Sequence, residues 1–366
     1  MAAPTEADRL MPLDATRAEF EDTPTAMARA LQSLAEPVRD LATALVLRHI
    51  GRVAVVGSGD SLAVGMMASC GFAQFADKPV DAVQAYEYAT YGHADFGADR
   101  AAVLISSSGR SSPTRDALTR ALAGDAFVIG ISDRSGPDNP FLSRPGATLC
   151  PGAAKRGMPT QSTSVTLAVL LMLAIEWGLV QGQVRSETAL QELRIMPKRL
   201  SAVVNAHAAA ASAIGAALTS WRQIHIVGTG PNVGTAHAGA LLFSAGPGLS
   251  AIPHAVEEFH HALRLAGLTD RDLVLVLAPP SCRAEARLAE TVLAAKARGA
   301  HVVVLGRDGL GGTSELPVPR TLEALSPLLL LPLLQQMALD AGLSVADDPL
   351  QPFRHRSFAA SYRTSW

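Results

Sequence analysis

Aromatic and charged residues are scarce in this chain, and its charges nearly cancel. Of 366 residues, 5% are aromatic and 17% are charged, with 31 Lys and Arg against 33 Asp and Glu. Surfaces that bind nucleic acid or anionic membranes carry an excess of positive charge, so neither partner is expected. The hydrophobic fraction of 48% excludes a disordered chain, and the length predicts two domains at about 150 residues each.

Cysteine is also rare, and its spacing excludes two common uses. Cys70, Cys150 and Cys282 lie far apart and form no Cys-x-x-Cys pair. Neither a disulfide framework nor a structural zinc site is therefore predicted, and a reducing, cytoplasmic location is expected. The acidic start of the chain lacks the apolar core of a secretory signal. The longest apolar runs, 165–175 and 325–334, are interpreted as too short to span a bilayer, so a soluble protein is expected.

One pattern occurs twice in the sequence, which predicts an internal duplication. A strand-like segment with a glycine loop, Arg52–Asp60, reappears as Gln223–Pro231 at an offset of 171, with both glycines in register. Three further landmarks repeat in the same order at offsets of 171, 172 and 175: Ala85–Tyr88 with Val256–Phe259, Val103–Ser106 with Leu275–Ala278, and Phe127–Asp133 with Val302–Asp308. Chance rarely produces four ordered landmarks with a slowly drifting offset, so the sequence predicts a duplicated α/β domain.

Within each half, short apolar strands alternate with helical stretches, as in parallel sheets with helical crossovers. Strands are expected at 52–56, 80–84, 102–106, 127–132, 147–150, 223–227, 249–252, 273–278 and 301–305. Helices are expected at 62–76, 114–123, 160–181, 233–245, 283–298 and 321–341, with two more within 13–50 and a helical connection over 186–217. The predicted fold class is α/β, each half being a doubly wound, flavodoxin-like three-layer domain. The predicted boundaries are a helical lead over 1–34, domains over 35–185 and 186–346, and a tail over 347–366.

A serine-rich loop follows the third expected strand. The segment Ser106–Ser111 places four serines around Gly109, and a helix is expected directly afterwards, with Pro113 suited to its first turn. Backbone N–H groups at such a helix start, together with the hydroxyls, form a neutral cradle for a dianionic phosphate. The alternative is a solvated turn without a ligand. In the second half, Ala278–Ser281 contains two prolines, which lack N–H donors, so no second phosphate site is expected there.

Four segments resemble the motifs of sugar isomerase (SIS) domains: Gly57–Ser61, Ile105–Ser111, Gln161–Ser164 and Glu258–His261. The duplicated arrangement over 20–350 is similar to the isomerase half of glucosamine-6-phosphate synthase and to related phosphosugar isomerases, amino-sugar phosphate deaminases and deglycases. The resemblance implies two SIS domains, a sugar phosphate or amino-sugar phosphate as ligand, and no cofactor. It also implies these binding residues: Ser58, Gly59, Ser106, Ser107, Ser108, Ser111, Ser162 and Thr163.

The chemical positions of the family are only partly present. In the relatives, one helix of the second domain begins with a glutamate and ends with the catalytic glutamate. Those positions are Ala238 and Ala245 here, and alanine cannot accept a proton. The C-terminal lysine of the synthase is also missing, because the sequence from Asp347 onward contains no lysine. His261 stands where the family has its ring-opening histidine. Because the catalytic glutamate and the lysine are missing, the usual isomerase mechanism is not assumed.

The predicted catalytic residues are Glu257, Glu258 and His261, where a carboxylate and an imidazole could converge. The alternative for Glu258 is a structural role, because its repeat mate Glu87 lies in a half with no known base. No metal is predicted, because the neighbouring histidines lack the spacing of ligands on one face. Other candidate sources of a cation near the ligand are Lys155, Arg156 and the basic tail at 354–356.

Two functions stay open. One is an enzyme that isomerises, deaminates or deglycates a phosphosugar; the other is a sugar-phosphate binding or regulatory protein that has lost the chemistry. The enzyme is favoured, because the leading segment is too short and acidic for the DNA-binding domain that sensors usually carry. A homodimer with a shared active site is expected. The apolar runs exceed what two cores need, and the family's histidine, His261 here, reaches across the dimer interface.

Overall fold

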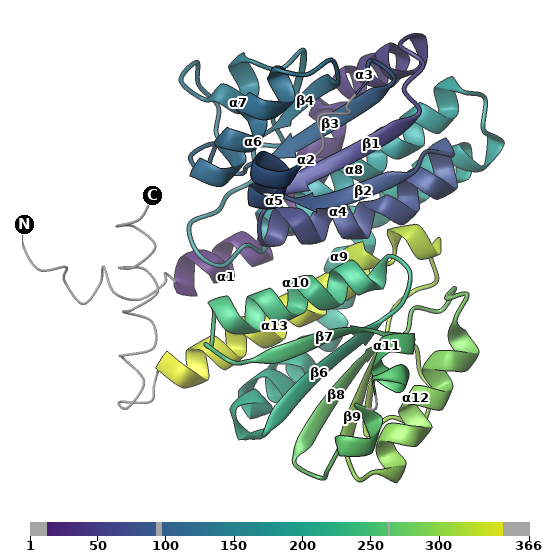
Figure 1. Cartoon of the computed structure of the whole chain (residues 1–366). Coiled ribbons are helices and arrows are strands. Elements are labelled where there is room, and N and C mark those ends of the chain that lie inside the picture. The colour runs from purple at the N-terminus through teal and green to yellow at the C-terminus, as the bar shows by residue number, and fades with distance from the viewer. Residues whose placement is uncertain (1–12, 93–96, 263, 347–366) are drawn as a thin grey trace, which may run out of the picture.

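A computed structural model describes residues 13–92, 97–262 and 264–346. Two separate five-stranded sheets, all of whose strand pairs are parallel, occupy the two halves of the chain (Figure 1). The first sheet contains β1 Arg52–Gly57, β2 Val80–Gln84, β3 Arg100–Ile105, β4 Phe127–Ile131 and β5 Ala147–Leu149. The second contains β6 Gln223–Gly228, β7 Ala251–Ala255, β8 Asp272–Leu277, β9 His301–Gly306 and β10 Ser314–Pro317.

The two sheets have the same topology. The first has the order β2-β1-β3-β4-β5, and the second, β10-β9-β8-β6-β7, is the same order read from the opposite edge. The starts of β6 and β7 are offset by 171 from those of β1 and β2, and the start of β8 is offset by 172 from that of β3. The predicted α/β class with two parallel sheets is therefore confirmed. The sequence missed β10 and placed β7 two positions too early, because both are short edge strands with weak apolar patterns.

Helices cover both faces of each sheet. In the first half they are α1 Leu13–Glu21, α2 Thr23–Ser33, α3 Ala35–Leu47, α4 Asp60–Gly71, α5 Ala85–Tyr91, α6 Ser112–Leu122, α7 Pro140–Ser143 and α8 Gln161–Val180. They continue as α9 Val184–Ala217, α10 Asn232–Ala245, α11 Val256–His261, α12 Glu285–Ala297 and α13 Pro327–Ala346. A π-helical turn extends α4 over Phe72–Ala76, and 3-10 turns occupy Leu218–Ser220, Leu265–Gly267 and Glu323–Leu325.

The start of the chain and the short helices differ from the sequence prediction. In the described part of the chain, three helices rather than two precede β1, because α2 begins anew after Asp22 with Pro24 in its first turn. An aspartate before a helix often acts as its N-cap, which the sequence predicts for Asp14, but Asp14 lies inside the first turn of α1. The helices α5, α7 and α11 were missed, because they are too short to show a helical period.

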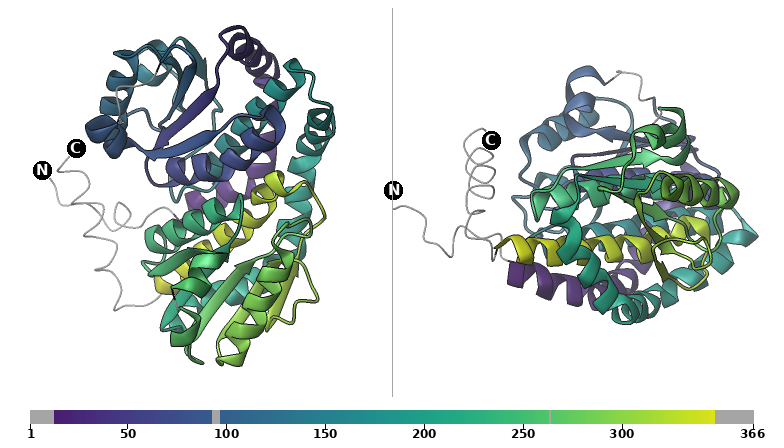
Figure 2. Two further views of the ribbon diagram at one scale, coloured as in Figure 1. Left: turned by 45° about the vertical axis from the view of Figure 1, so that its right-hand side comes forward. Right: turned by 90° about the horizontal axis from the view of Figure 1, so that it is seen from below.

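One apolar core joins the two halves. α4 packs against α10, and α13 packs against α9 and α10, so these helices form a shared layer between the sheets (Figures 1 and 2). The largest cluster of buried side chains includes residues from both sheets and from this layer. Two smaller clusters lie on the outer faces, one under α6 and one under α12. Figure 2 also shows α1 beside α13, a contact that ties the start of the described chain to its end.

Three helical segments are long and apolar enough to cross a membrane by length and composition: Gln161–Val180, Val184–Ser220 and Glu323–Val345. The expectation that the apolar runs are too short is therefore wrong, because the helices that contain them extend past the runs themselves. In the first and third segments, 89% and 83% of the apolar window is buried inside the protein. Packing in the shared core accounts for the hydrophobicity of these two helices.

Candidate active site

The strand order of the first sheet reverses between β1 and β3, and open parallel sheets bind ligands at the carboxyl ends of strands at such a point. The loop after β1 contains Ser58 and Gly59, and the serine-rich loop follows β3. Gly59 has a φ of +58°, which favours glycine. The side-chain amide of Gln84, at the end of β2, donates a hydrogen bond to Ser58 Oγ at 3.3 Å. Three strand ends therefore meet at one edge.

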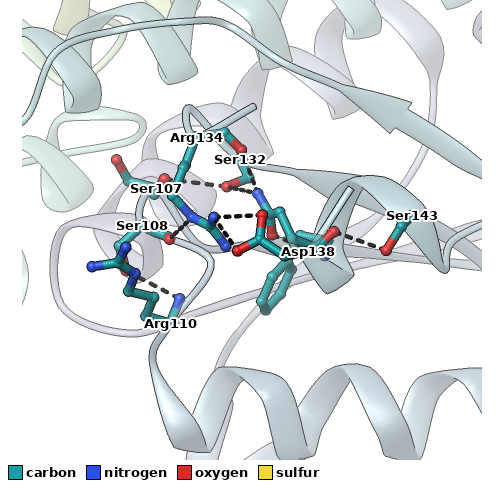
Figure 3. Close-up of polar contacts among 9 residues, drawn as sticks. Ser107, Ser108, Arg110, Ser132, Arg134, Asp138 and Ser143 are labelled. Atoms are coloured by element: carbon teal, nitrogen blue, oxygen red, sulfur yellow. Dashed lines mark hydrogen bonds and ion pairs between the residues drawn. The ribbon is translucent and has the colours of Figure 1, made fainter. Parts of the chain in front are cut away.

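The segment after β4 fixes the serine-rich loop (Figure 3). The Ser107 carbonyl accepts hydrogen bonds from Ser132 Oγ at 3.1 Å and from the backbone N–H groups of Asp133 and Arg134 at 3.2 and 3.3 Å. Arg134 Nε donates to the Ser108 carbonyl at 2.9 Å. Two successive carbonyls thus point toward the segment after β4, and the N–H group of the Ser107–Ser108 peptide points the opposite way.

Two further contacts make this loop rigid. The guanidinium of Arg134 donates to both carboxylate oxygens of Asp138 at 3.0 and 2.8 Å (Figure 3). Gly109 has a φ of +64°, and a Cβ there would lie 2.3 Å from Asn139 Oδ1. Only glycine fits this position, because the serine-rich loop packs closely against the segment after β4.

The serine-rich loop presents free donors. Within the described chain, the backbone N–H groups of Ser107, Ser108 and Ser111 have no hydrogen-bond partner. Ser111 is the N-cap residue of α6, and Pro113 lies in the first turn as predicted, which leaves the helix start open. Unpaired N–H groups at a helix start attract anions. Of the loop serines, Ser106 is buried and the others are at least partly exposed.

A pocket of about 270 Å³ opens beside the loop. It is lined by Ser107, Ser108, Arg110, Asp133, Arg134, Ala153 and Lys155. The Asp133 carboxylate accepts hydrogen bonds from Ser107 Oγ at 2.6 Å and from the Ala153 N–H at 3.1 Å. Burial raises the pKa of Asp133 to about 6, against the lowering effects of these hydrogen bonds and of Lys155. The pocket therefore combines cations with one carboxyl group that titrates near neutrality.

A second polar cluster adjoins the pocket. Lys155 Nζ binds both carboxylate oxygens of Asp60 at 3.3 and 3.0 Å, and Asp60 begins α4 directly after the glycine loop. Thr163 Oγ1 donates to the Pro159 carbonyl at 2.8 Å and lies 3.4 Å from Asp60 Oδ2. Ser162 is buried in the first turn of α8, and its Oγ has no partner within the described residues. The structure thus brings Lys155, Thr163 and the glycine loop together.

The predicted catalytic segment lies elsewhere in the chain. α11 packs against β6, β7 and α12, in the second half. Glu257 binds Arg287 through both carboxylate oxygens at 2.9 and 3.1 Å, which favours a structural role for it. Glu258 and His261 are exposed. None of these side chains lines the pocket beside the serine-rich loop, so their catalytic role stays a prediction that needs a second subunit.

The end of α10, where the family has its catalytic glutamate, carries no acid–base group. Ala238 is buried in the core and Ala245 ends the helix. The next residue, Gly246, lies against Met158, since a Cβ there would be 2.2 Å from its Sδ. The helix end therefore adjoins the loop that follows Lys155. The tail candidates at 354–356 lie outside the described residues.

Comparison with known proteins finds a family that part of the chain resembles. Residues 46–176 match the family model of the SIS domain. The match covers β1 to β5, hence the glycine loop, the serine-rich loop and the pocket beside it. It does not extend over the second half, so the assignment of two SIS domains stays a proposal.

The chain is also similar to larger proteins and to solved structures. It is 26% identical over 353 residues to the isomerizing glutamine–fructose-6-phosphate aminotransferase of Zymomonas mobilis, covering 91% of this chain and 56% of that protein. The chain spans about half the length of the curated relatives it matches. The C-terminal domain of the glucosamine-fructose-6-phosphate aminotransferase of Francisella tularensis shares its fold, with a TM-score of 0.81, 15% identity, and coverage of 91% and 97%. Tagatose-6-phosphate ketose/aldose isomerase of Escherichia coli has a TM-score of 0.75, 17% identity, and coverage of 92% and 94%.

Sequence reasoning missed Asp133 and the residues that hold the serine-rich loop. Asp133 ends the repeated Phe127–Asp133 landmark, so its position after a strand was visible. Its burial and its contact with Ser107 were not, because they depend on how β3 and β4 pair.

Proposed function

We propose that the protein binds a sugar phosphate or amino-sugar phosphate at the serine-rich loop and catalyses an isomerase-type proton transfer on the sugar. The observation that carries this proposal is the set of unpartnered N–H groups at Ser107, Ser108 and Ser111, held rigid by the segment after β4. Serine hydroxyls and the cations of Arg110, Arg134 and Lys155 surround the same pocket. A dianionic phosphate satisfies these donors, as anions do at helix starts.

Asp133 is the acid–base group that this chain supplies at the pocket. Its carboxylate takes a proton from the carbon next to the sugar carbonyl and returns it to the neighbouring carbon. A pKa of about 6 suits both steps, because the group is mostly ionised near pH 7 and still holds a proton readily. The Lys155 ammonium, which lines the same pocket, stabilises the negative charge that develops on the sugar oxygen.

The proposed working unit is a homodimer, and each of its subunits consists of two tandem SIS domains. His261 of the partner subunit completes the active site by opening the sugar ring. The exposure of His261 supports this assignment, since the side chain is accessible to another subunit. The second half has the topology of the first, which supports the second SIS domain.

The decisive experiment follows deuterium incorporation by NMR when the protein is incubated in D₂O with hexose and hexosamine phosphates. Exchange at C2 is expected with one of them. Ser108→Asp puts like charge beside the phosphate and should abolish binding and exchange. Ser135→Asp adds the same charge at an exposed neighbouring position outside the pocket and should keep both. If Ser108→Asp binds every sugar phosphate as the wild type does, the proposed site is wrong.

A binding or regulatory protein is the second candidate function. The alanines at 238 and 245 favour it, because the two positions of α10 that carry glutamates in the relatives carry no acid–base group here. Phosphosugar binding that Ser108→Asp abolishes, together with no exchange at any carbon in the wild type, would establish this second function.

A further inference from the structure

A second crevice lies at the carboxyl edge of the other sheet. The strand order there reverses between β6 and β8, so this edge is also a place where open parallel sheets bind ligands. Two adjoining cavities of about 390 and 430 Å³ open at this point and share Gln74, Arg283 and Glu323 in their walls. Each is larger than the pocket beside the serine-rich loop.

The internal duplication makes the two crevices equivalent. Gly230 of the loop after β6 has a φ of +53°, and its repeat mate Gly59 has a φ of +58°. Arg283 lies at an offset of 172 from Ser111, the offset that relates β8 to β3, and it directly precedes Ala284, the N-cap residue of α12, as Ser111 is the N-cap residue of α6. Gln74, on the helical turn that extends α4, corresponds at the offset of 171 to Ala245, the last residue of α10. The two halves therefore have a crevice at the same place in the fold, and different side chains line each one.

Three arginines line the second crevice. Arg283 is 84% exposed, and its Nε lies 3.8 Å from a carboxylate oxygen of Glu323. Arg320 Nε donates to Ser281 Oγ at 3.2 Å. Among the described residues, Arg185 at the start of α9 forms no ion pair. Guanidinium groups bind phosphate and carboxylate through paired hydrogen bonds, so the crevice is suited to an anion.

Glu323 is the acidic residue in the wall of this crevice. Its carboxylate accepts hydrogen bonds from the backbone N–H of Arg283 at 3.3 Å, and its side chain is only 14% exposed. A Cβ at Gly230 would lie 3.6 Å from Glu323 Oε1, so the carboxylate lies against both loops. Since the prolines at 279 and 280 lack N–H groups, no backbone cradle is available. The guanidinium groups are therefore the groups of this crevice that suit an anion, and the Glu323 carboxylate is an acceptor that suits hydroxyl groups.

We propose that this crevice is a second ligand site, for a hydroxylated small anion of the sugar-phosphate class. The phosphate binds Arg185 and Arg283, and sugar hydroxyls donate to Glu323. This site is separate from the serine-rich loop, and it does not depend on the function proposed for that loop.

Calorimetry with glucose 6-phosphate and with inorganic phosphate tests the proposal in the Ser108→Asp background, where the first site is closed. Binding of glucose 6-phosphate should persist, and inorganic phosphate should bind more weakly because it lacks the hydroxyls. Adding Arg283→Gln should weaken binding about tenfold or more, the value of one charge-assisted hydrogen bond. Adding Glu323→Gln should tighten inorganic phosphate binding, because it removes a like charge and keeps an acceptor for the Arg283 N–H.

The matched control is Arg194→Gln, which removes an exposed arginine of α9 outside both cavities and should leave affinity unchanged. Cys70 lines the crevice, so its alkylation, followed by peptide mass spectrometry, should slow when glucose 6-phosphate is bound. The proposal is overturned if Ser108→Asp alone removes all binding, if Arg283→Gln and Arg194→Gln behave alike, or if both ligands bind equally.

Discussion

Replacing Asp133 with asparagine should make the protein more stable near pH 8 and leave its stability near pH 4 unchanged. The carboxyl group is held by Ser107 Oγ and by the Ala153 N–H. An asparagine in the same place accepts from the Ala153 N–H through Oδ1 and donates to Ser107 Oγ through Nδ2. The substitution therefore keeps both hydrogen bonds and removes the negative charge that burial disfavours.

The pKa sets the sign and the size of this effect. Burial raises the folded-state pKa of Asp133 to about 6 from an ordinary value of 3.8, so the folded protein binds this proton more tightly than the unfolded chain. The stabilisation of the folded protein that comes from this tighter proton binding is fully present below about pH 4 and is lost as the pH rises through about 6. Two pKa units correspond to about 3 kcal/mol, of which roughly half falls between pH 5 and pH 8.

Urea unfolding followed by circular dichroism at several pH values and constant salt measures the difference between Asp133→Asn and the wild type. Asp138→Asn is the matched control, because Arg134 lowers the pKa of that carboxyl group and its pH dependence should have the opposite sign. If the free energies of unfolding of Asp133→Asn and the wild type differ by the same amount from pH 4 to pH 8, the reasoning is refuted.

Two further predictions concern the serine-rich loop and the dimer. Gly109→Ala should destabilise the protein by about 1–3 kcal/mol and weaken phosphate binding, because φ is positive and a Cβ would collide with Asn139; calorimetry and thermal unfolding measure the two effects, and unchanged values would contradict them. Mixing Ser108→Asp with His261→Ala after dissociation and reassociation should restore part of the activity if the active site is shared, because hybrid dimers contain one intact site. Hybrids confirmed by mass measurement but lacking activity would show that the site is not shared.

The sequence alone located nine of the ten strands that the structure describes in the two sheets. The repeat of strand and glycine loop at an offset of 171, with its slow drift, placed β1, β2, β6 and β8 to within a position or two. This worked because buried parallel strands are continuous apolar runs, and because a glycine with positive φ must follow them in both halves. The serine-rich loop and the helix after it could also be predicted, because the serines, Gly109 and Pro113 are neighbours in the sequence. The conformation of the loop depends in addition on the segment after β4.

Tertiary structure decided which side chains share a pocket. Asp133 and Lys155 belong to different loops, and the pairing of β3, β4 and β5 is what places them beside Ser107. The pKa of Asp133 follows from burial, which no local pattern reveals. The apolar runs of α8 and α13 could not be assigned from sequence, because a helix buried in a shared core and a helix that spans a bilayer have the same composition. What distinguishes the two is the set of side chains that surround the helix, and those come from distant parts of the chain.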